Sequence, residues 1–290
     1  MSASPFSDTH RDYSVLAPVV AAIERRAGGA AGLAAGLPPL FRQAVDEVID
    51  APRTNRFTIG ELEKTEKTYL GTKVEILLRD FLKLPKGQVL DLSIDGVEVD
   101  IKNTMQRTWT IPSESHGHPA LLLRLNEIKA LCDAGLVVVR PEYLNPGQNR
   151  DAKKTLSAEG MTNIWWLLRQ QPYPPNFWEV LPSADRKEIF AAGSASARLA
   201  LLFSKLQRQP ISRLQVQAVA QQHDYMKRLR RNGGARDTLI ANGIALLSGR
   251  TDGALISALR LAPVGAEEFI SLAPENEHEL ALLNTAGQLS

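Results

Sequence analysis

The first part of the chain has apolar residues at the spacing of amphipathic helices. In residues 15–28 and 40–50, apolar positions recur every three or four residues, and glycines end the first of these stretches. Residues 60–84 have the same periodicity and follow Thr58, a residue type that favours the start of a helix. We therefore predict three helices, with Glu75 near the end of the third.

The middle of the chain changes to the patterns of β-strands. Residues 89–102 alternate apolar and polar positions, and residues 120–125 and 135–144 contain apolar runs. The segment between these runs, residues 125–135, has helical spacing, so we predict a helix there. Strands interleaved with helices predict a mixed α/β fold.

A proline-rich segment separates this region from a mainly helical C-terminal part. Residues 169–182 contain four prolines and no clear periodicity, which indicates a connector. We place a first domain at residues 1–168, a linker at 169–176 and a second domain at 177–290. Within the second domain we predict helices at residues 196–207, 213–222 and 224–232, and a short strand at residues 243–249.

Basic residues collect in part of the second domain, although the net charge of the chain is only +2. Between Lys205 and Arg236 there are eight basic residues and one acid, Asp224. The last two predicted helices, joined by a tight turn and followed by a wing strand, fit a helix-turn-helix arrangement. A solvated helix face is the alternative explanation. The predicted DNA contacts are Lys227, Arg228, Arg230, Arg231 and Arg236.

The strand region contains a hairpin whose register can be deduced. Asp95-Gly96 is a dipeptide that favours a two-residue type I′ turn. That turn pairs Leu92 with Val99 and Asp91 with Asp100. Because side chains alternate along a strand, the apolar residues fall on one face of the hairpin. The other face carries Asp91, Ser93, Glu98, Asp100 and Lys102.

This polar face contains a candidate catalytic centre. A solvated outer face is the usual explanation of an amphipathic hairpin. However, two carboxylates directly opposite each other repel and destabilise the pair. A divalent cation between Asp91 and Asp100 would reverse that interaction, since Mg²⁺ is held by one or two carboxylates together with phosphate and water oxygens. Lys102 projects from the same face, where it could stabilise developing charge on a phosphate.

Composition narrows the class and compartment of the protein. With 290 residues, of which 44% are hydrophobic, the chain is long enough to bury a core. The single cysteine, Cys132, cannot form an internal disulfide, which fits a reducing compartment. No apolar stretch approaches the length of a membrane span, and the N-terminal residues lack the layout of a secretory signal. We expect a cytoplasmic protein without membrane association.

Four segments resemble one enzyme family. The pattern Asp, short spacer, Asp-x-Lys with a preceding helical Glu is the signature of PD-(D/E)xK nucleases. The wider sequence, from about Arg53 to Gly249, resembles the NaeI family of type IIE restriction endonucleases. The four segments, in this order, are KTEKTYLGTKVEILL (64–78), DLSIDGVEVDIK (91–102), VRPEYLNPGQNRDAKKTLS (139–157) and QQHDYMKRLRRNGGAR (221–236).

The resemblance implies a role for each residue of the motif. Glu75, Asp91, Asp100 and Lys102 would be catalytic, with Mg²⁺ as cofactor on Asp91, Asp100 and Glu75. Residues 1–168 would form an endonuclease domain with a central sheet flanked by helices. Residues 177–290 would form a winged helix-turn-helix domain, similar to that of catabolite activator proteins, that binds a second DNA copy as activator.

These expectations define a function and two alternatives. The leading hypothesis is a type II, IIE-like endonuclease that makes double-strand breaks at a short, GC-rich palindrome. Cutting both strands requires two centres, so we expect a homodimer that binds two DNA copies per protomer. The alternatives are a DNA-nicking repair endonuclease and a non-cleaving winged-helix regulator.

Residues 103–115 form a candidate base-reading loop. A polar, basic loop, for which DNA contact and interdomain packing are both open, contains Tyr143, Asn145, Asn149, Arg150, Lys153 and Lys154.

Overall fold

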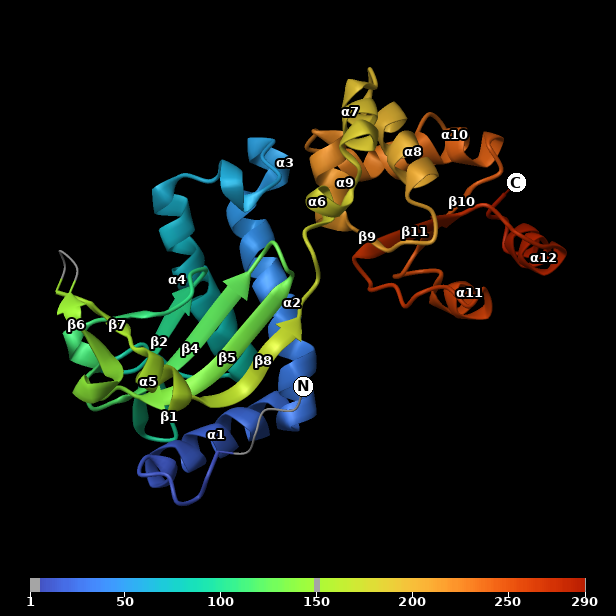
Figure 1. Ribbon diagram of the computed structural model, residues 1–290. Helices are drawn as coiled ribbons and strands as arrows, with labels where there is room; N and C mark the ends of the chain where they lie inside the picture. The colour runs from blue at the N-terminus through green and yellow to red at the C-terminus, as the bar shows by residue number, and fades with distance from the viewer. Residues whose placement is uncertain (1–5, 149–151, 290) are drawn as a thin grey trace. The chain divides into compact units, whose positions relative to one another are not determined.

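The computed structural model describes residues 6–148 and 152–289, which form two compact units (Figure 1). The N-terminal unit comprises Met1–Ile49 and Thr58–Phe177, and the C-terminal unit comprises Asp50–Phe57 and Trp178–Ser290. Asn149 and Arg150, predicted to lie in a basic loop, are outside the described residues. No helix among the described residues is long and apolar enough to cross a membrane.

Three long helices of the N-terminal unit follow the predicted periodicity. They are α1 (Tyr13–Ala27), α2 (Gly29–Ile49) and α4 (Lys64–Leu82). The buried positions of α4 recur at intervals of four: Leu70, Val74, Leu78 and Leu82. Thr58 was predicted to begin this helix, but it caps the short 3₁₀ turn η1 (Ile59–Glu61) instead. The residue that caps α4 is Glu63.

The core of the N-terminal unit is a five-stranded sheet. Its strands are β1 (Leu92–Ile94), β2 (Val97–Thr104), β4 (Pro119–Asn126), β5 (Leu131–Val138) and β8 (Trp165–Pro172), in the spatial order β1-β2-β4-β5-β8. Strands β2 and β4 are parallel, and the other neighbours are antiparallel. Figure 1 shows α2 and α4 against one face of this sheet. The prediction of a mixed α/β unit with a helix-flanked sheet is confirmed.

Smaller elements cover the other face of the sheet. They are β3 (Thr110–Ile111), β6 (Leu144–Gln148), β7 (Lys154–Leu156), α5 (Ala158–Thr162), and the 3₁₀ turns η2 (Ser113–Ser115) and η3 (Pro141–Tyr143). A buried cluster that includes Trp109, Leu122 and Val137 packs between the layers. The Trp109 indole N–H donates to the Leu123 carbonyl at 2.8 Å, so its polar atom is satisfied within the core.

The helix predicted over residues 125–135 is wrong. Strands β4 and β5 form an antiparallel hairpin in which Asn126 pairs with Leu131 and Leu125 with Cys132. Ala130 adopts a left-handed backbone (φ 48°), and Ile128 at the tip is 96% exposed. The apolar residues on either side of this tip are buried within the sheet, so strand pairing overrides the local helical spacing.

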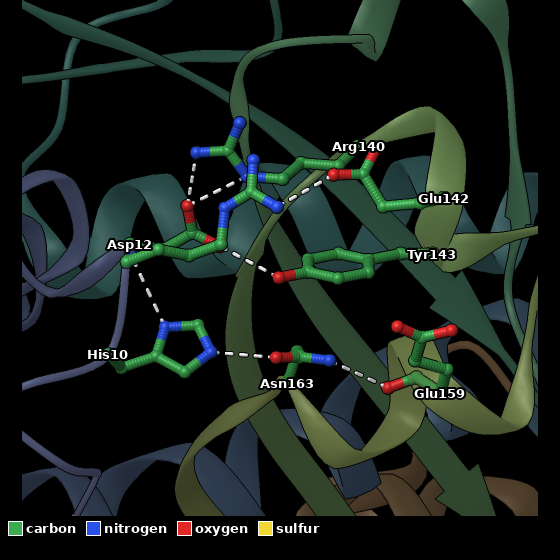
Figure 2. Close-up of polar contacts among 8 residues, drawn as sticks. His10, Asp12, Arg140, Glu142, Tyr143, Glu159 and Asn163 are labelled. Carbon is green, nitrogen blue, oxygen red and sulfur yellow. Dashed lines mark hydrogen bonds and ion pairs between the residues drawn. The ribbon is translucent and has the colours of Figure 1, made fainter.

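The N-terminal segment is attached to the sheet by a buried aspartate (Figure 2). Asp12 is fully buried, and Arg140 donates to its Oδ1 from two nitrogens, with the Nε bond at 2.8 Å. The Tyr143 hydroxyl donates to Asp12 Oδ2 at 3.3 Å. His10 bonds Asn163 Oδ1 through Nε2 at 2.7 Å and accepts the Asp12 backbone N–H through Nδ1 at 3.1 Å. The bonds from Asp12 to Arg140 and Tyr143 and from His10 to Asn163 join residues more than 120 positions apart in the chain.

The C-terminal unit is mainly helical, as predicted, with a small sheet. Its helices and turns are α3 (Ala51–Thr54), α6 (Phe177–Val180), α7 (Ser183–Ala191), α8 (Ala195–Lys205), α9 (Arg213–Ala220), η4 (Tyr225–Leu229), α10 (Ala235–Ala241), α11 (Gly253–Ala258) and α12 (Glu277–Thr285). Its strands, β9 (Ile211–Ser212), β10 (Ala245–Ser248) and β11 (Glu268–Leu272), are ordered β10-β11-β9. The strand predicted over residues 243–249 corresponds to β10.

The basic helix predicted over residues 224–232 is wrong. Only the 3₁₀ turn η4 forms there, and the chain then takes an extended conformation at Arg230 before α10 begins at Ala235. Asn232 and Gly233 both have positive φ angles. The carboxylate of Asp237 accepts the N–H groups of Asn232 (3.1 Å) and Gly233 (2.6 Å), which stabilises this loop instead of a continuous helix.

The boundaries of the two units differ from the predicted domain limits in two places. Residues 169–172 lie in β8 rather than in a linker, because Pro172 pairs with Leu131 of β5. Asp50–Phe57, placed in the first domain by the sequence, belongs to the C-terminal unit. There the Phe57 ring contacts Trp178 and Phe190, with ring centroids 4.6 and 5.2 Å apart.

Candidate active site

The β1–β2 hairpin has the predicted register. Leu92 pairs with Val99 and Ile94 with Val97. Asp95 and Gly96 both have positive φ angles, 48° and 87°, as a type I′ turn requires. Leu92, Ile94 and Val99 are buried. The turn therefore fixes which side chains of the hairpin share the polar face.

Two aspartates and a lysine meet on that face. Lys102 Nζ lies 2.5 Å from Asp100 Oδ1 and 3.8 Å from Asp91 Oδ2. The Asp91 carboxylate also accepts the Ile101 backbone N–H at 2.8 Å, which fixes it against β2. The side chains of Asp91 and Lys102 are 34% and 22% exposed, so this centre is open to a ligand on one side.

Asp100 is the most enclosed member of the centre. It is 3% exposed, and burial raises its pKa, as does its close contact with Asp91. Hydrogen bonds from Lys102 and Ser115 act in the opposite direction. The Ser115 hydroxyl, which is fully buried at the end of η2, donates to Asp100 Oδ2. Ser115 was expected only as the last residue of a candidate base-reading loop, because its separation of 15 residues from Asp100 gives no local signal of this contact.

Glu75 approaches the centre from α4. It follows Val74 at the edge of the buried stripe of that helix, and its side chain is 23% exposed. Its pKa is raised by burial and, to a lesser extent, by the charge of Asp91. Arg79 Nη1, one helical turn further on, lies 3.6 Å from Glu75 Oε1 and partly offsets both effects. The structure thus brings Glu75 into electrostatic reach of Asp91.

A glutamate on the same hairpin orders the loop that leads into Asp91. Glu98 accepts three consecutive backbone N–H groups, from Gln88 (3.0 Å), Val89 (3.1 Å) and Leu90 (2.8 Å). These bonds lower the pKa of Glu98. The sequence placed Glu98 on the polar face but gave it no role. Its bonds to Gln88, Val89 and Leu90 fix the backbone immediately before Asp91, so it is a positioning residue.

The donor set of this centre fits a hard divalent cation. Within the residues that the structure describes, no group of three or more His, Cys, Asp or Glu side chains is gathered to hold a metal ion. Mg²⁺ does not require such a group, since it is bound by one or two carboxylates together with phosphate and water oxygens. The facing carboxylates of Asp91 and Asp100 meet this requirement. A cation would also stabilise the charged form of Asp100, which burial disfavours.

Four of the predicted DNA-binding residues lie in η4 and the loop after it, and not on one helix, and Arg236 lies in α10. Lys227 lies 3.3 Å from Asp224, and Arg228 bonds Gln222 at 2.8 Å. Arg231 donates to the Gly287 carbonyl, whereas Arg230 is exposed on the loop after η4.

Arg236 has a structural role. Its guanidinium donates to the Leu246 carbonyl and lies 3.1 Å from Gln288 Oε1. Burial lowers its pKa. Arg236 therefore ties α10 to β10 rather than standing free for phosphate contact.

Comparison with known proteins assigns the chain to a family. The family described as "Restriction endonuclease NaeI" matches residues 32–278. The type II restriction enzyme NaeI of Lentzea aerocolonigenes is 37% identical over 216 residues, which cover 72% of this chain and 68% of that protein. The match includes both the hairpin with its two aspartates and most of the C-terminal unit. The chain belongs to the NaeI family of restriction endonucleases, a class of site-specific deoxyribonucleases.

Proposed function

We propose that this protein hydrolyses a phosphodiester bond in each strand of its DNA site, with Mg²⁺ at the β1–β2 hairpin. The observation that carries the proposal is the pair of facing carboxylates, Asp91 and Asp100, with Lys102 Nζ 2.5 Å from one and 3.8 Å from the other. Without a cation or a basic group, such a pair would repel.

Each side chain has a distinct proposed role. Mg²⁺ bound between Asp91 and Asp100 would supply Lewis-acid stabilisation of the charge that develops on the phosphate. The Lys102 ammonium, which lies beside both carboxylates, would stabilise that charge directly. Glu75, whose pKa is raised, is suited to accept a proton from an attacking water. Ser115 and Glu98 hold Asp100 and the approach to Asp91 in position.

The specificity of the enzyme is a further part of the proposal. Family membership supports a short, GC-rich palindrome as its site. Cleavage of both strands of a palindrome needs two copies of the centre, so we propose a homodimer.

The order α8-β9-α9-α10-β10-β11 supports a winged helix-turn-helix in the C-terminal unit. In that arrangement α10, and not residues 224–232, would be the recognition helix. We propose that this unit binds a second DNA copy as activator.

Plasmid cleavage tests the proposal. The protein with Mg²⁺ should produce double-strand cuts at fixed sites, and Asp100→Asn should abolish cutting while it leaves DNA binding intact, because only the metal-binding carboxylate is changed. Asp80→Asn, a change of the same kind at an exposed position on α4, is the matched control. Single-strand nicks would favour the repair-enzyme alternative, and binding without any cutting would favour the regulator.

A further inference from the structure

A polar pocket lies at one end of the central sheet, beyond the catalytic hairpin. It has a volume of about 300 Å³ and is lined by Gln106, Arg107, Arg124, Asn126, Lys129 and Gln170, among others. The register pairs Thr104 with Arg124, and Arg124 with Asp133. Because paired residues point to the same face, Arg124 and Asp133 share the face of the sheet that carries Asp100 and Lys102.

One cation of this pocket is already neutralised. Arg124 Nε donates to Asp133 Oδ2 at 2.8 Å, and its guanidinium lies over the Trp109 ring at 5.4 Å. Asp133 is 4% exposed and also accepts the Gln170 backbone N–H at 2.8 Å. The single acid of the lining is thus occupied by Arg124 and by the backbone. Asp133 therefore forms the floor of the pocket and is not available to bind a cation.

The two other cations of the lining have no acidic partner. Arg107 and Lys129 are exposed, and neither forms a salt bridge within residues 6–148 and 152–289. The Arg107 carbonyl accepts a bond from Arg124 Nη1 at 3.2 Å, so the backbone is fixed while the Arg107 side chain is available. Because the charges of Arg124 and Asp133 cancel, the charges of Arg107 and Lys129 give the pocket a net positive charge.

A break in strand pairing occurs at the same place. The register of β5 with β8 shifts between Cys132 and Ala134, and Gln170 has a left-handed backbone (φ 49°). A non-glycine residue in that conformation inside a strand is strained, and such strain is concentrated at functional sites. The bulge places Gln170 at the rim of the pocket.

From these observations we infer that the pocket binds a backbone phosphate of the DNA substrate, several nucleotides from the cleaved bond. This inference rests on the proposed function of the hairpin. Met105 to Arg107 lie three to five residues beyond Lys102 along the chain, which at about 3.3 Å per residue of extended chain is at most roughly 10–17 Å. Each strand of B-DNA carries one phosphate per 3.4 Å of axis, so the distance corresponds to about three to five nucleotides.

The shape of the site favours a phosphate over a base edge. Base edges lie inside the grooves of a duplex and are read by side chains that protrude into them. A concave pocket instead accepts the part of the duplex that protrudes, which is the sugar–phosphate backbone. Arg107 and Lys129 supply the charge, and the amides of Gln106 and Gln170 supply neutral donors. Such a contact would fix the register of the DNA relative to Asp100 and Lys102.

Salt-dependent binding of a duplex that contains the cleavage site tests this inference. The double variant Arg107→Gln/Lys129→Gln is compared with the wild-type protein, with Ca²⁺ replacing Mg²⁺ so that binding is read without cleavage. The slope of log K against log salt should fall by about 1, and affinity at 0.1 M salt should fall about tenfold, equally for cognate and unrelated sequences. Arg25→Gln/Lys83→Gln, which removes two exposed cations that have acidic partners, is the matched control.

A scan of the DNA backbone locates the phosphate. One neutral methylphosphonate linkage is placed at each position of the duplex in turn. A linkage about three to five nucleotides from the cut should weaken wild-type binding about tenfold and leave the double variant unaffected, since both changes remove the same contact. An unchanged salt slope, a relaxed sequence preference, or equal effects at all linkages would overturn the inference. If the wild-type protein binds but never cuts, the proposed function fails while the binding result still decides the role of the pocket.

Discussion

At the scale of single residues, the proposed catalytic centre depends on the groups that hold its two aspartates in place. Asp100 is buried, and a buried carboxylate is stable only when its oxygens have partners. Lys102 satisfies Oδ1 and Ser115 satisfies Oδ2. The orientation of Asp100 therefore depends on a serine from a separate segment of the chain.

Ser115→Ala should slow cleavage without preventing folding. The substitution leaves Asp100 Oδ2 without its partner, and a hydrogen bond to a charged group contributes about 1.5–3 kcal/mol. We expect the single-turnover cleavage rate to fall by about 10- to 100-fold with little change in DNA affinity. Ser113→Ala, an exposed serine in the same 3₁₀ turn, is the control and should cut at the wild-type rate. Equal rates for both variants would contradict the role given to Ser115.

Glu98 should give the protein a pH-dependent stability. Its pKa is lowered in the folded state, so the stabilisation is present above the unfolded value of about 4.3 and is lost as pH falls through the folded pKa. The wild-type protein should therefore be more stable than Glu98→Gln at pH 7, and the difference should shrink at pH 3. Urea denaturation at the two pH values measures this. A difference that stays constant or grows towards pH 3 would refute the assignment.

At the scale of elements, the loop before β1 is shaped by close packing around Gly87. A Cβ at Gly87 would lie 2.4 Å from the Leu90 carbonyl oxygen and 2.6 Å from Glu98 Oε2. Only a glycine allows the Glu98 carboxylate to reach the three N–H groups that it accepts. The element that carries Asp91 thus depends on a residue four positions before it.

Gly87→Ala should disturb this loop. Overpacking of this kind costs about 1–3 kcal/mol, and the displaced Glu98 would release the backbone before Asp91. We expect both a lower urea midpoint and slower cleavage. Gly147→Ala is the control, because a Cβ there meets no atom within 4 Å. Should the two variants behave alike in both assays, the packing argument would fail.

Strand pairing and side-chain hydrogen bonding explain the two errors made at this scale. Residues 125–135 have helical spacing, yet they form the tip of the β4–β5 hairpin because Leu125 and Cys132 are buried opposite each other. Residues 224–232 have the charge pattern of a recognition helix. The chain forms a turn at Asn232 and Gly233 instead, because the Asp237 carboxylate accepts hydrogen bonds from their backbone N–H groups. In both cases a contact that is invisible to local periodicity decides the structure.

At the scale of the whole molecule, the chain is held together by contacts between segments that are distant in sequence. Asp12 attaches the N-terminal segment to Arg140 and Tyr143 (Figure 2). Next to it, Arg11 pairs with Glu142 at the surface, with both side chains about half exposed. The two ion pairs join the same segments, but only in the first is the carboxylate buried.

Removal of the buried partner should therefore be much more harmful. Asp12→Ala removes the buried acceptor of the bonds from Arg140 and Tyr143, and a hydrogen bond to a charged group contributes about 1.5–3 kcal/mol. Glu142→Gln removes an exposed pair, which contributes at most about 1 kcal/mol. Urea denaturation of the two variants measures the contrast. Similar losses of stability would show that Asp12 does not anchor the segment.

The sequence alone determined the hairpin and its polar face, because a two-residue turn of Asp95 and Gly96 fixes the register of both strands through local geometry. Helical periodicity likewise determined α1, α4 and the second half of α2, whose first half, from Gly29, was not predicted. Only the tertiary structure decided which groups complete the centre. Ser115 and Glu75 reach Asp100 and Asp91 through the packing of other segments, and Asp50–Phe57 joins the C-terminal unit. Such contacts depend on pairing across long sequence separations, which no local pattern encodes.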